Sequence, residues 1–194
     1  MALASFMVPI GTPAPEFTLP AVDGGEVSLD SFKEPALLVV FLSNHCPYVR
    51  KIETELGIVA AELAERGLAT VAICSNDTVN YPDDDAAHLR DQVRRAGFGF
   101  PYLIDESQEV ACAYQAACTP DLFLYDSERR LAYRGRFDAA TPGNDEPVDG
   151  SSLRQAVDFV LAGQPVPEPH TPSVGCGIKW KHGRTPGGWV TPRS

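Results

Sequence analysis

The residues best suited to covalent chemistry in this sequence are its cysteines, and Cys46 is the one placed for reactivity. A thiol reacts as its thiolate, and an ordinary cysteine has a pKa near ~8.5, so a working cysteine needs surroundings that favour the anion. Cys46 lies between an apolar run and a helical pattern, where unpaired N–H groups and the positive end of a helix dipole are expected to point toward its sulfur. Cys46 is therefore the candidate nucleophile, and the alternative is a small apolar residue packed in a loop.

Three basic side chains lie close to this thiol in the sequence. His45 precedes Cys46, and Arg50 and Lys51 follow it in the expected helix. An adjacent histidine can tune a thiol, but shielding or packing is the alternative, and we do not expect His45 to act as a general base. The cysteines and histidines lack the C-x-x-C and H-x-x-x-H spacings of zinc sites, so we expect neither a metal nor another cofactor.

The remaining cysteines divide by their expected surroundings. Cys74 and Cys112 fall at inward positions of a predicted strand and a predicted helix, so we expect both to pack in the core. The set of five is odd and widely spaced, unlike the disulfide framework of a small secreted protein, so at least one thiol is expected to remain free.

Alternating strand and helix patterns are expected to position Cys46. Residues 36–43 form a nearly continuous apolar run, typical of a strand buried on both faces. Apolar residues then recur at helical spacing from Pro47 until Gly67, and proline is tolerated in a first helical turn. A second buried strand over 68–75 and an exposed helix after the acidic residues 83–85 complete a βαβ pattern.

Further strands and helices are predicted before and after this βαβ unit. A β-hairpin is predicted over 17–29, and a short strand, a helix and a hairpin of two strands are predicted between 101 and 138. An amphipathic helix begins near Ser151 and ends at Gly163. From 164 onward proline and glycine are dense, so we expect neither a long helix nor a central strand there. We therefore predict one domain over 1–163 and a tail over 164–194 that packs on it.

Composition limits the partners that this chain is expected to bind. The formal charge is −10 with both signs spread along the sequence, which opposes general binding to nucleic acid or to anionic lipid. The first residues lack a secretory pattern, and no apolar run is long enough to span a membrane. We therefore expect a cytoplasmic protein.

Four segments resemble the peroxiredoxin-like branch of the alkyl hydroperoxide reductase and thiol-specific antioxidant family, within the thioredoxin-like superfamily. They are GTPAPEFTLP, FLSNHCPYVRK, ACTPDLFLYD and TPSVGCGIKWK, in the order that branch shows, between about Gly11 and Lys181. The resemblance implies an α/β thioredoxin-like fold with a central mixed β-sheet flanked by helices, an N-terminal β-hairpin and an irregular C-terminal tail.

The residues around Cys46 differ from both the thioredoxin motif and the peroxidase motif of this superfamily. Cys46 falls on the first cysteine of the thioredoxin C-x-x-C, whereas Val49 occupies the position of the second. Against the peroxidase signature P-x-x-x-T-x-x-C, Ser43 stands for the threonine and Val39 occupies the proline position. The usual dithiol is therefore missing and the peroxidase signature is incomplete.

The resemblance also implies binding residues around the thiol. It implies that the Thr119–Pro120 bond is cis and faces the active cysteine, and that the exposed backbone of Thr119 can pair with a substrate peptide or with glutathione. The expected binding residues are therefore His45, Pro47, Thr119 and Pro120.

Two cysteines are candidates to resolve Cys46. Cys176 lies between Gly175 and Gly177, where flexibility lets it reach another sulfur, and a bridge requires Cα atoms within about 7 Å. Cys118 lies near Pro120, but successive side chains of a strand point to opposite faces, so it is the weaker candidate. Simple anchoring of the tail by its apolar residues is compatible with either role.

These residues predict a thiol-dependent oxidoreductase with antioxidant activity. Cys46 attacks a disulfide or a peroxide, forming a mixed disulfide or a sulfenic acid that a second thiol resolves. The expected reductant is a thioredoxin-like protein or a low-molecular-weight thiol. The alternative is a non-catalytic redox sensor or thiol-binding module, which the valine at position 49 favours, and a structural protein on the same fold remains a third possibility.

Overall fold

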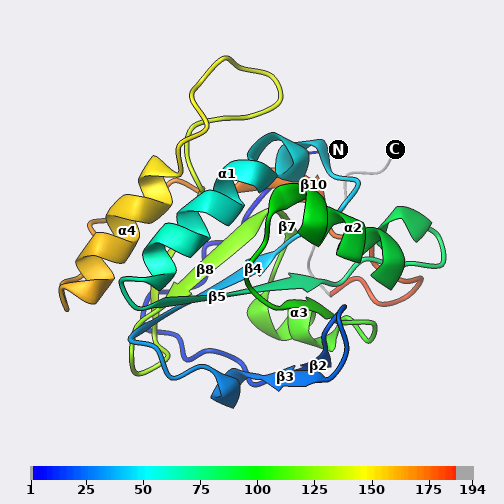
Figure 1. Ribbon diagram of the computed structural model, residues 1–194, viewed down its shortest axis with the longest axis horizontal. Helices are drawn as coiled ribbons and strands as arrows, with labels where there is room; N and C mark the ends of the chain where they lie inside the picture. Colours follow the sequence, from blue (N-terminus) through cyan, green and yellow to red (C-terminus); the bar gives the residue numbers. More distant parts are fainter. Residues whose placement is uncertain (1, 187–194) are drawn as a thin grey trace.

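The computed structural model describes residues 2–186 and has a central sheet with helices on both faces (Figure 1). The helices are α1 (Pro47–Ala64), α2 (Ala86–Ala96), α3 (Glu109–Tyr114) and α4 (Ser151–Leu161), with short 3-10 helices at Leu29–Ser31 and Pro82–Asp84. The strands are β1 (Ala2–Ala4), β2 (Thr18–Pro20), β3 (Glu26–Ser28), β4 (Ala36–Phe41), β5 (Leu68–Cys74), β6 (Tyr102–Ile104), β7 (Cys118–Thr119), β8 (Asp121–Tyr125), β9 (Leu131–Gly135) and β10 (Val174–Gly177).

The central sheet is mixed, with the strand order β6-β5-β4-β8-β9. Strand β4 pairs in parallel with β5 and antiparallel with β8, and every residue of β4 and β5 is buried. Apolar residues on both faces explain this position, because only a covered strand can bury both sets of side chains. The fold is the thioredoxin-like α/β arrangement that the sequence predicts.

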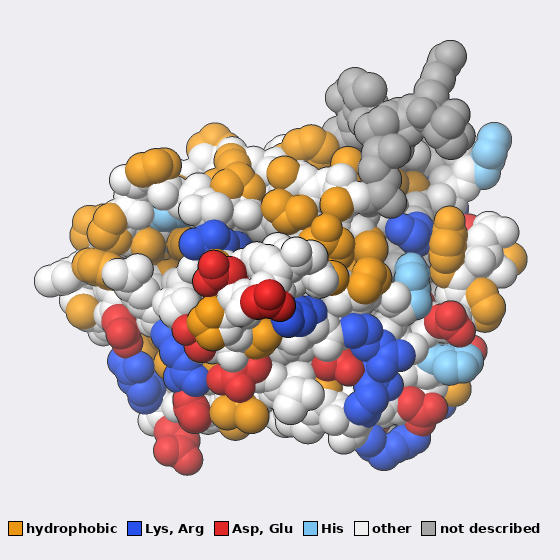
Figure 2. All heavy atoms as spheres, turned by 90° about the horizontal axis from the view of Figure 1, so that it is seen from above, with side chains coloured by type: hydrophobic (Ala, Val, Ile, Leu, Met, Phe, Trp, Pro, Cys, Tyr) orange, Lys and Arg blue, Asp and Glu red, His pale blue; other side chains and the backbone are white. Residues whose placement is uncertain are grey.

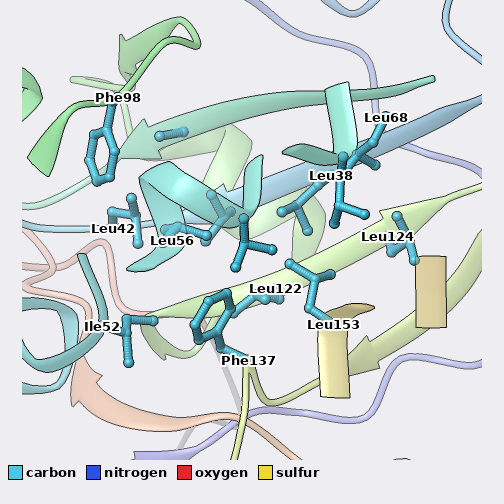
Figure 3. Packing of buried hydrophobic residues seen from close by; sticks show 14 of the residues in the cluster. Leu38, Leu42, Ile52, Leu56, Leu68, Phe98, Leu122, Leu124, Phe137 and Leu153 are labelled. Carbon is cyan, nitrogen blue, oxygen red and sulfur yellow. The ribbon is translucent and has the colours of Figure 1, made fainter. Parts of the chain in front are cut away.

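Alternate residues of β4 enter two different cores. Leu38 and Val40 belong to the cluster that includes side chains of α1, α2 and α4. Leu37 and Phe41 belong to the cluster that includes α3 and the β2–β3 hairpin. Figure 3 shows the first cluster, in which Leu56 of α1 packs over the sheet. The helix that begins at the candidate nucleophile is therefore fixed to the sheet by its apolar face.

Most predicted elements are confirmed. The N-terminal hairpin is β2 paired with β3, the βαβ unit is β4-α1-β5, and the last helix is α4. The ends of these elements differ from the predicted ends by a few residues, as capping and fraying allow.

The prediction that the segment after 164 forms no central strand is wrong. Strand β10 is the middle strand of a second sheet with the order β1-β10-β7. The four residues of β10 contain no proline, and Gly175 lets the strand approach β7 so closely that an added Cβ would collide with the Thr119 carbonyl. Proline density around a segment therefore did not exclude a strand within it.

The residues after β10 contact the rest of the domain through apolar side chains and hydrogen bonds. Ile178 is buried and Trp180 packs on the cluster that includes α3. The Lys179 N–H donates to Asn76 Oδ1 at 2.8 Å, and the Lys179 carbonyl accepts from the Asp77 N–H at 2.8 Å. This part of the tail is thus integrated into the domain.

Charges of both signs are mixed on the surface of the described residues, as the sequence predicts. Figure 2 shows basic and acidic side chains interspersed on one face, which gives that face no continuous basic surface for phosphates. Within residues 2–186, no helix has the length and apolar character needed to cross a membrane.

Candidate active site

Cys46 is the N-cap of α1, with Pro47 as the first helical residue. The predicted strand-to-helix position of the thiol is therefore confirmed. The sulfur accepts no capping hydrogen bond from α1; instead Sγ donates to the carbonyl oxygen of Thr119 at 3.0 Å. The sulfur thus lies at the start of the helix and is directed at a carbonyl oxygen.

The thiol is also covered. Cys46 is 0% exposed and belongs to the apolar cluster around α1, against which Cys176 also packs. Because β10 contacts both α1 and β7, the chain itself closes over the sulfur. A reagent therefore reaches Cys46 only past this strand or through a neighbouring opening.

Cys176 lies beside Cys46. Strand β10 places Cys176 opposite Thr119, whose carbonyl accepts from Cys46. Burial, followed by the hydrogen bond with Cys46, raises the pKa of Cys176 to about 11. This pKa favours the protonated form of Cys176 at neutral pH.

The peptide bond between Thr119 and Pro120 is cis, as the resemblance implies. The Thr119 hydroxyl lies 3.0 Å from the Ser43 hydroxyl, which joins β7 to the loop before Cys46. The expectation that the Thr119 backbone is exposed to an incoming strand is wrong, because β10 occupies that edge. Thr119 and Pro120 remain close to the thiol, but with an internal strand as their neighbour.

Cys118 faces a different environment. Its Sγ donates to the Pro120 carbonyl at 3.6 Å, and β10 places Gly177 rather than a cysteine opposite it. Burial, and next the charge of Asp121, raise the pKa of this thiol well above its usual range. The arrangement favours Cys176 over Cys118 as the partner of Cys46.

The two cysteines expected in the core behave differently. Cys74 is buried as predicted, and burial raises the pKa of its thiol. Cys112 is exposed, so that prediction is wrong. Helix α3 is short and buries Val110, Ala111 and Tyr114, which turns Cys112 outward.

Asp84 is a site residue that sequence reasoning missed. It is 0% exposed, and its Oδ2 lies 2.7 Å from His45 Nδ1 while Oδ1 accepts the Asn44 N–H at 2.7 Å. Burial opposes ionisation, but hydrogen bonds from His45 and Asn76 outweigh it and lower the pKa of this carboxyl. Asp84 thereby fixes the loop that carries Cys46.

His45 is held by this carboxylate and by an aromatic ring. It stacks on Tyr81 at 5.6 Å between ring centroids and is partly exposed. Arg50, which follows Cys46 in the first turn of α1, donates from Nε to the Asn44 carbonyl at 2.7 Å. Within residues 2–186, no group of three or more His, Cys, Asp or Glu side chains is placed to hold a metal ion.

Asp84→Asn tests this support through stability. A carboxyl whose pKa is depressed by folding stabilises the native state above its unfolded pKa of ~3.9, and this contribution disappears as pH falls through the folded pKa. We expect the variant to lose about 2 kcal/mol of unfolding free energy above pH ~5 in urea titrations, with the difference shrinking toward pH ~3. The control is Asp83→Asn, whose side chain is exposed. Equal stability of Asp84→Asn and the parent at neutral pH would contradict this role.

Gly175→Ala tests the cover over Cys46. The added Cβ would collide with the Thr119 carbonyl and push β10 away from β7. We expect iodoacetamide to label Cys46 about tenfold faster, as followed by peptide mass mapping, because labelling depends on local opening. Gly143→Ala is the matched control, since a Cβ there meets no atom within 4 Å. An unchanged labelling rate in Gly175→Ala would show that β10 does not limit access.

Comparisons with known proteins agree with this fold. Residues 10–134 match the AhpC/TSA family model. The crystal structure of a hypothetical protein from Sinorhizobium meliloti 1021 is 50% identical, with a TM-score of 0.91, covering 93% of this chain and 99% of that chain. The thioredoxin domain of a thiol-disulfide oxidoreductase from Bacteroides vulgatus is 17% identical, with a TM-score of 0.60 over 79% of this chain and 99% of that chain, and shows the same fold.

A more distant curated relative is the thiol-disulfide oxidoreductase ResA of Bacillus anthracis. It is 24% identical over 122 residues, which make up 63% of this chain and 66% of the relative. The match thus spans slightly less than two thirds of that protein. The residues that match the family model include Cys46 at the helix start and the cis Thr119–Pro120 bond. The chain belongs to the AhpC/TSA family.

Proposed function

We propose that this protein is a thiol-dependent oxidoreductase in which Cys46 reacts with the substrate and Cys176 resolves the product. The observation that carries this proposal is the meeting of the two thiols across Thr119, one at the start of α1 and the other on β10. Cys176 thereby takes the place of the second cysteine that position 49 lacks.

The same pair can reduce a peroxide or a disulfide. With a peroxide, the Cys46 thiolate attacks one oxygen, the O–O bond breaks and the alkoxide or hydroxide leaves with a proton; Cys176 then displaces water from the sulfenic acid. With a disulfide, Cys46 displaces one thiolate, and Cys176 displaces the other from the mixed disulfide. Either route ends in a Cys46–Cys176 disulfide, which two equivalents of an external thiol reduce.

Family membership and the name of one relative support this proposal. In the family name, AhpC stands for alkyl hydroperoxide reductase, and the relative ResA is called a thiol-disulfide oxidoreductase. We propose a thioredoxin-like protein or a low-molecular-weight thiol as the reductant.

A redox sensor is the second candidate, and the burial of Cys46 favours it. A covered thiol that donates to a carbonyl reacts slowly until its surroundings open. In a sensor, a single oxidation event would change the packing of β10 without repeated turnover.

Turnover separates these functions. We propose to supply hydrogen peroxide, or oxidised glutathione, with excess dithiothreitol and to follow oxidant consumption per protein molecule. Consumption of many equivalents beyond the uncatalysed rate supports the enzyme. Consumption that stops at one equivalent supports the sensor, and no protein-dependent consumption contradicts both.

A further inference from the structure

The edge of β7 beside Cys46 is closed to a polypeptide substrate. Cys46 Sγ contacts the Thr119 carbonyl, so a substrate strand paired with Thr119 would lie where β10 already lies. The opposite edge of β10 is paired with β1, and Ser5 after β1 donates to the buried Asp121. A substrate therefore needs another route to the sulfur, one that does not require pairing with a strand.

A hollow of about 110 Å³ opens next to the site. Tyr48 from the first turn of α1, Pro120 and Val174 line it, and each of these residues is a near neighbour in sequence of Cys46, Thr119 or Cys176. Val174 and Cys176 lie on the same face of β10, because side chains alternate along a strand. The hollow is therefore lined by sequence neighbours of both thiols on three separate elements, while Cys46 and Cys176 themselves lie outside its lining.

The walls of the hollow are largely apolar. Ile52 and Phe137, which Figure 3 shows within the core cluster, form part of its lining. Such a surface fits an apolar group of small size, whose burial is favourable by about 25 cal/mol per Å².

Arg136 adds an unpaired positive charge to this lining. Its Nε is buried without a hydrogen-bond partner, and among the ion pairs of residues 2–186 none involves Arg136. A buried donor without a partner is costly, and a charged donor especially so. The other charged residue of the hollow is Asp138, whose oxygens accept the N–H groups of Ala140, Asp149 and Gly150. Asp138 is thereby occupied, whereas Nε of Arg136, which also borders a second hollow beside His170, has no partner.

We propose that this hollow is the substrate site of Cys46 and that Arg136 selects small apolar oxidants carrying a carboxylate or another oxyanion. The proposal rests on the proposed function, because it concerns the substrate of the same thiol pair. A guanidinium bound to a carboxylate forms charge-assisted hydrogen bonds, which are stronger than neutral ones. Arg136 is thus a specificity-determining residue, and the chemistry stays with Cys46 and Cys176.

Two aromatic disulfides, one anionic and one neutral, test whether Arg136 selects anionic substrates. Dithiobis(nitrobenzoate) carries a carboxylate on each ring, and dithiodipyridine carries no charge at neutral pH. In both cases Cys46 displaces one aryl thiolate to form a mixed disulfide, and Cys176 displaces the second with loss of its proton. The protein dithiol is oxidised by two electrons and the aryl disulfide is reduced, so release of aryl thiolate reports the rate.

We would measure rate constants in a Cys112→Ser background, because Cys112 is an exposed thiol outside the site. In Arg136→Gln we expect the ratio of the rate constants for the anionic and neutral probes to fall about tenfold, the size of one charge-assisted hydrogen bond. Arg136→Lys keeps the charge but loses the Nε–H donor, and we expect a smaller fall in the same direction. Arg130→Gln removes the same charge from an exposed residue at the other end of β9 and is expected to leave the ratio unchanged.

The outcomes distinguish this inference from the proposed function. An unchanged ratio in Arg136→Gln, or an equal fall in Arg130→Gln, overturns the selection by Arg136. If the parent protein fails to react with either probe at Cys46, the proposed function fails as well. A fall confined to the Arg136 variants supports the site.

Discussion

Cys46→Ser is expected to lower turnover of peroxide or disulfide by about a thousandfold or more. A serine hydroxyl at the start of α1 occupies nearly the same space but does not ionise at neutral pH, so the nucleophile is lost while the packing is kept. The measurement is steady-state oxidant consumption with dithiothreitol, together with circular dichroism to show that the fold is retained.

The matched control for this variant is Cys112→Ser. Cys112 lies exposed on α3 and takes no part in the hydrogen bonds of the site, so its replacement removes a thiol without touching Cys46. We expect Cys112→Ser to retain the parent rate. Full turnover in Cys46→Ser would remove the assignment of the nucleophile.

Cys176→Ser is expected to separate the first chemical step from the second. Cys46 can still be oxidised once, but no thiol on β10 then resolves it, so sulfenic acid or mixed disulfide accumulates at Cys46. We expect steady-state turnover to fall about a hundredfold, while the oxidation of Cys46 in a single turnover persists. Rapid mixing followed by dimedone trapping and mass spectrometry measures both.

Cys118→Ala serves as the comparison for the second thiol. Cys118 is buried and its Sγ donates a hydrogen bond to the Pro120 carbonyl. We therefore expect that oxidised Cys46 is still resolved when Cys118 is removed. If Cys118→Ala blocks turnover and Cys176→Ser does not, the roles assigned to these two cysteines are reversed.

The local patterns of the chain predicted most of the fold. Strands β4 and β5 are buried on both faces, and strands of this kind can be recognised in a sequence by their continuous apolar runs. Helix α1 was predicted from its apolar spacing and from Pro47 at its start, and these features also place Cys46 at the N-cap. Short-range physics therefore fixed the position of the candidate nucleophile.

Long-range contacts were harder to predict. Nothing in the run of residues 83–85 distinguishes Asp85, which caps α2, from Asp84, which turns inward to His45. The role of β10 depends on pairing with β1 at the other end of the sequence and with β7 more than 50 residues before it. The glycines around Cys176 suggested flexibility, whereas Gly175 actually permits close packing against Thr119.

A disulfide map of the oxidised protein tests the central claim most directly. After one equivalent of hydrogen peroxide, and with free thiols blocked in acid, peptide mass mapping is expected to find the segment containing Cys46 linked to the one containing Cys176. The other three cysteines would carry the blocking group. A Cys46 that remains free, or that is linked to any other cysteine, would contradict the account.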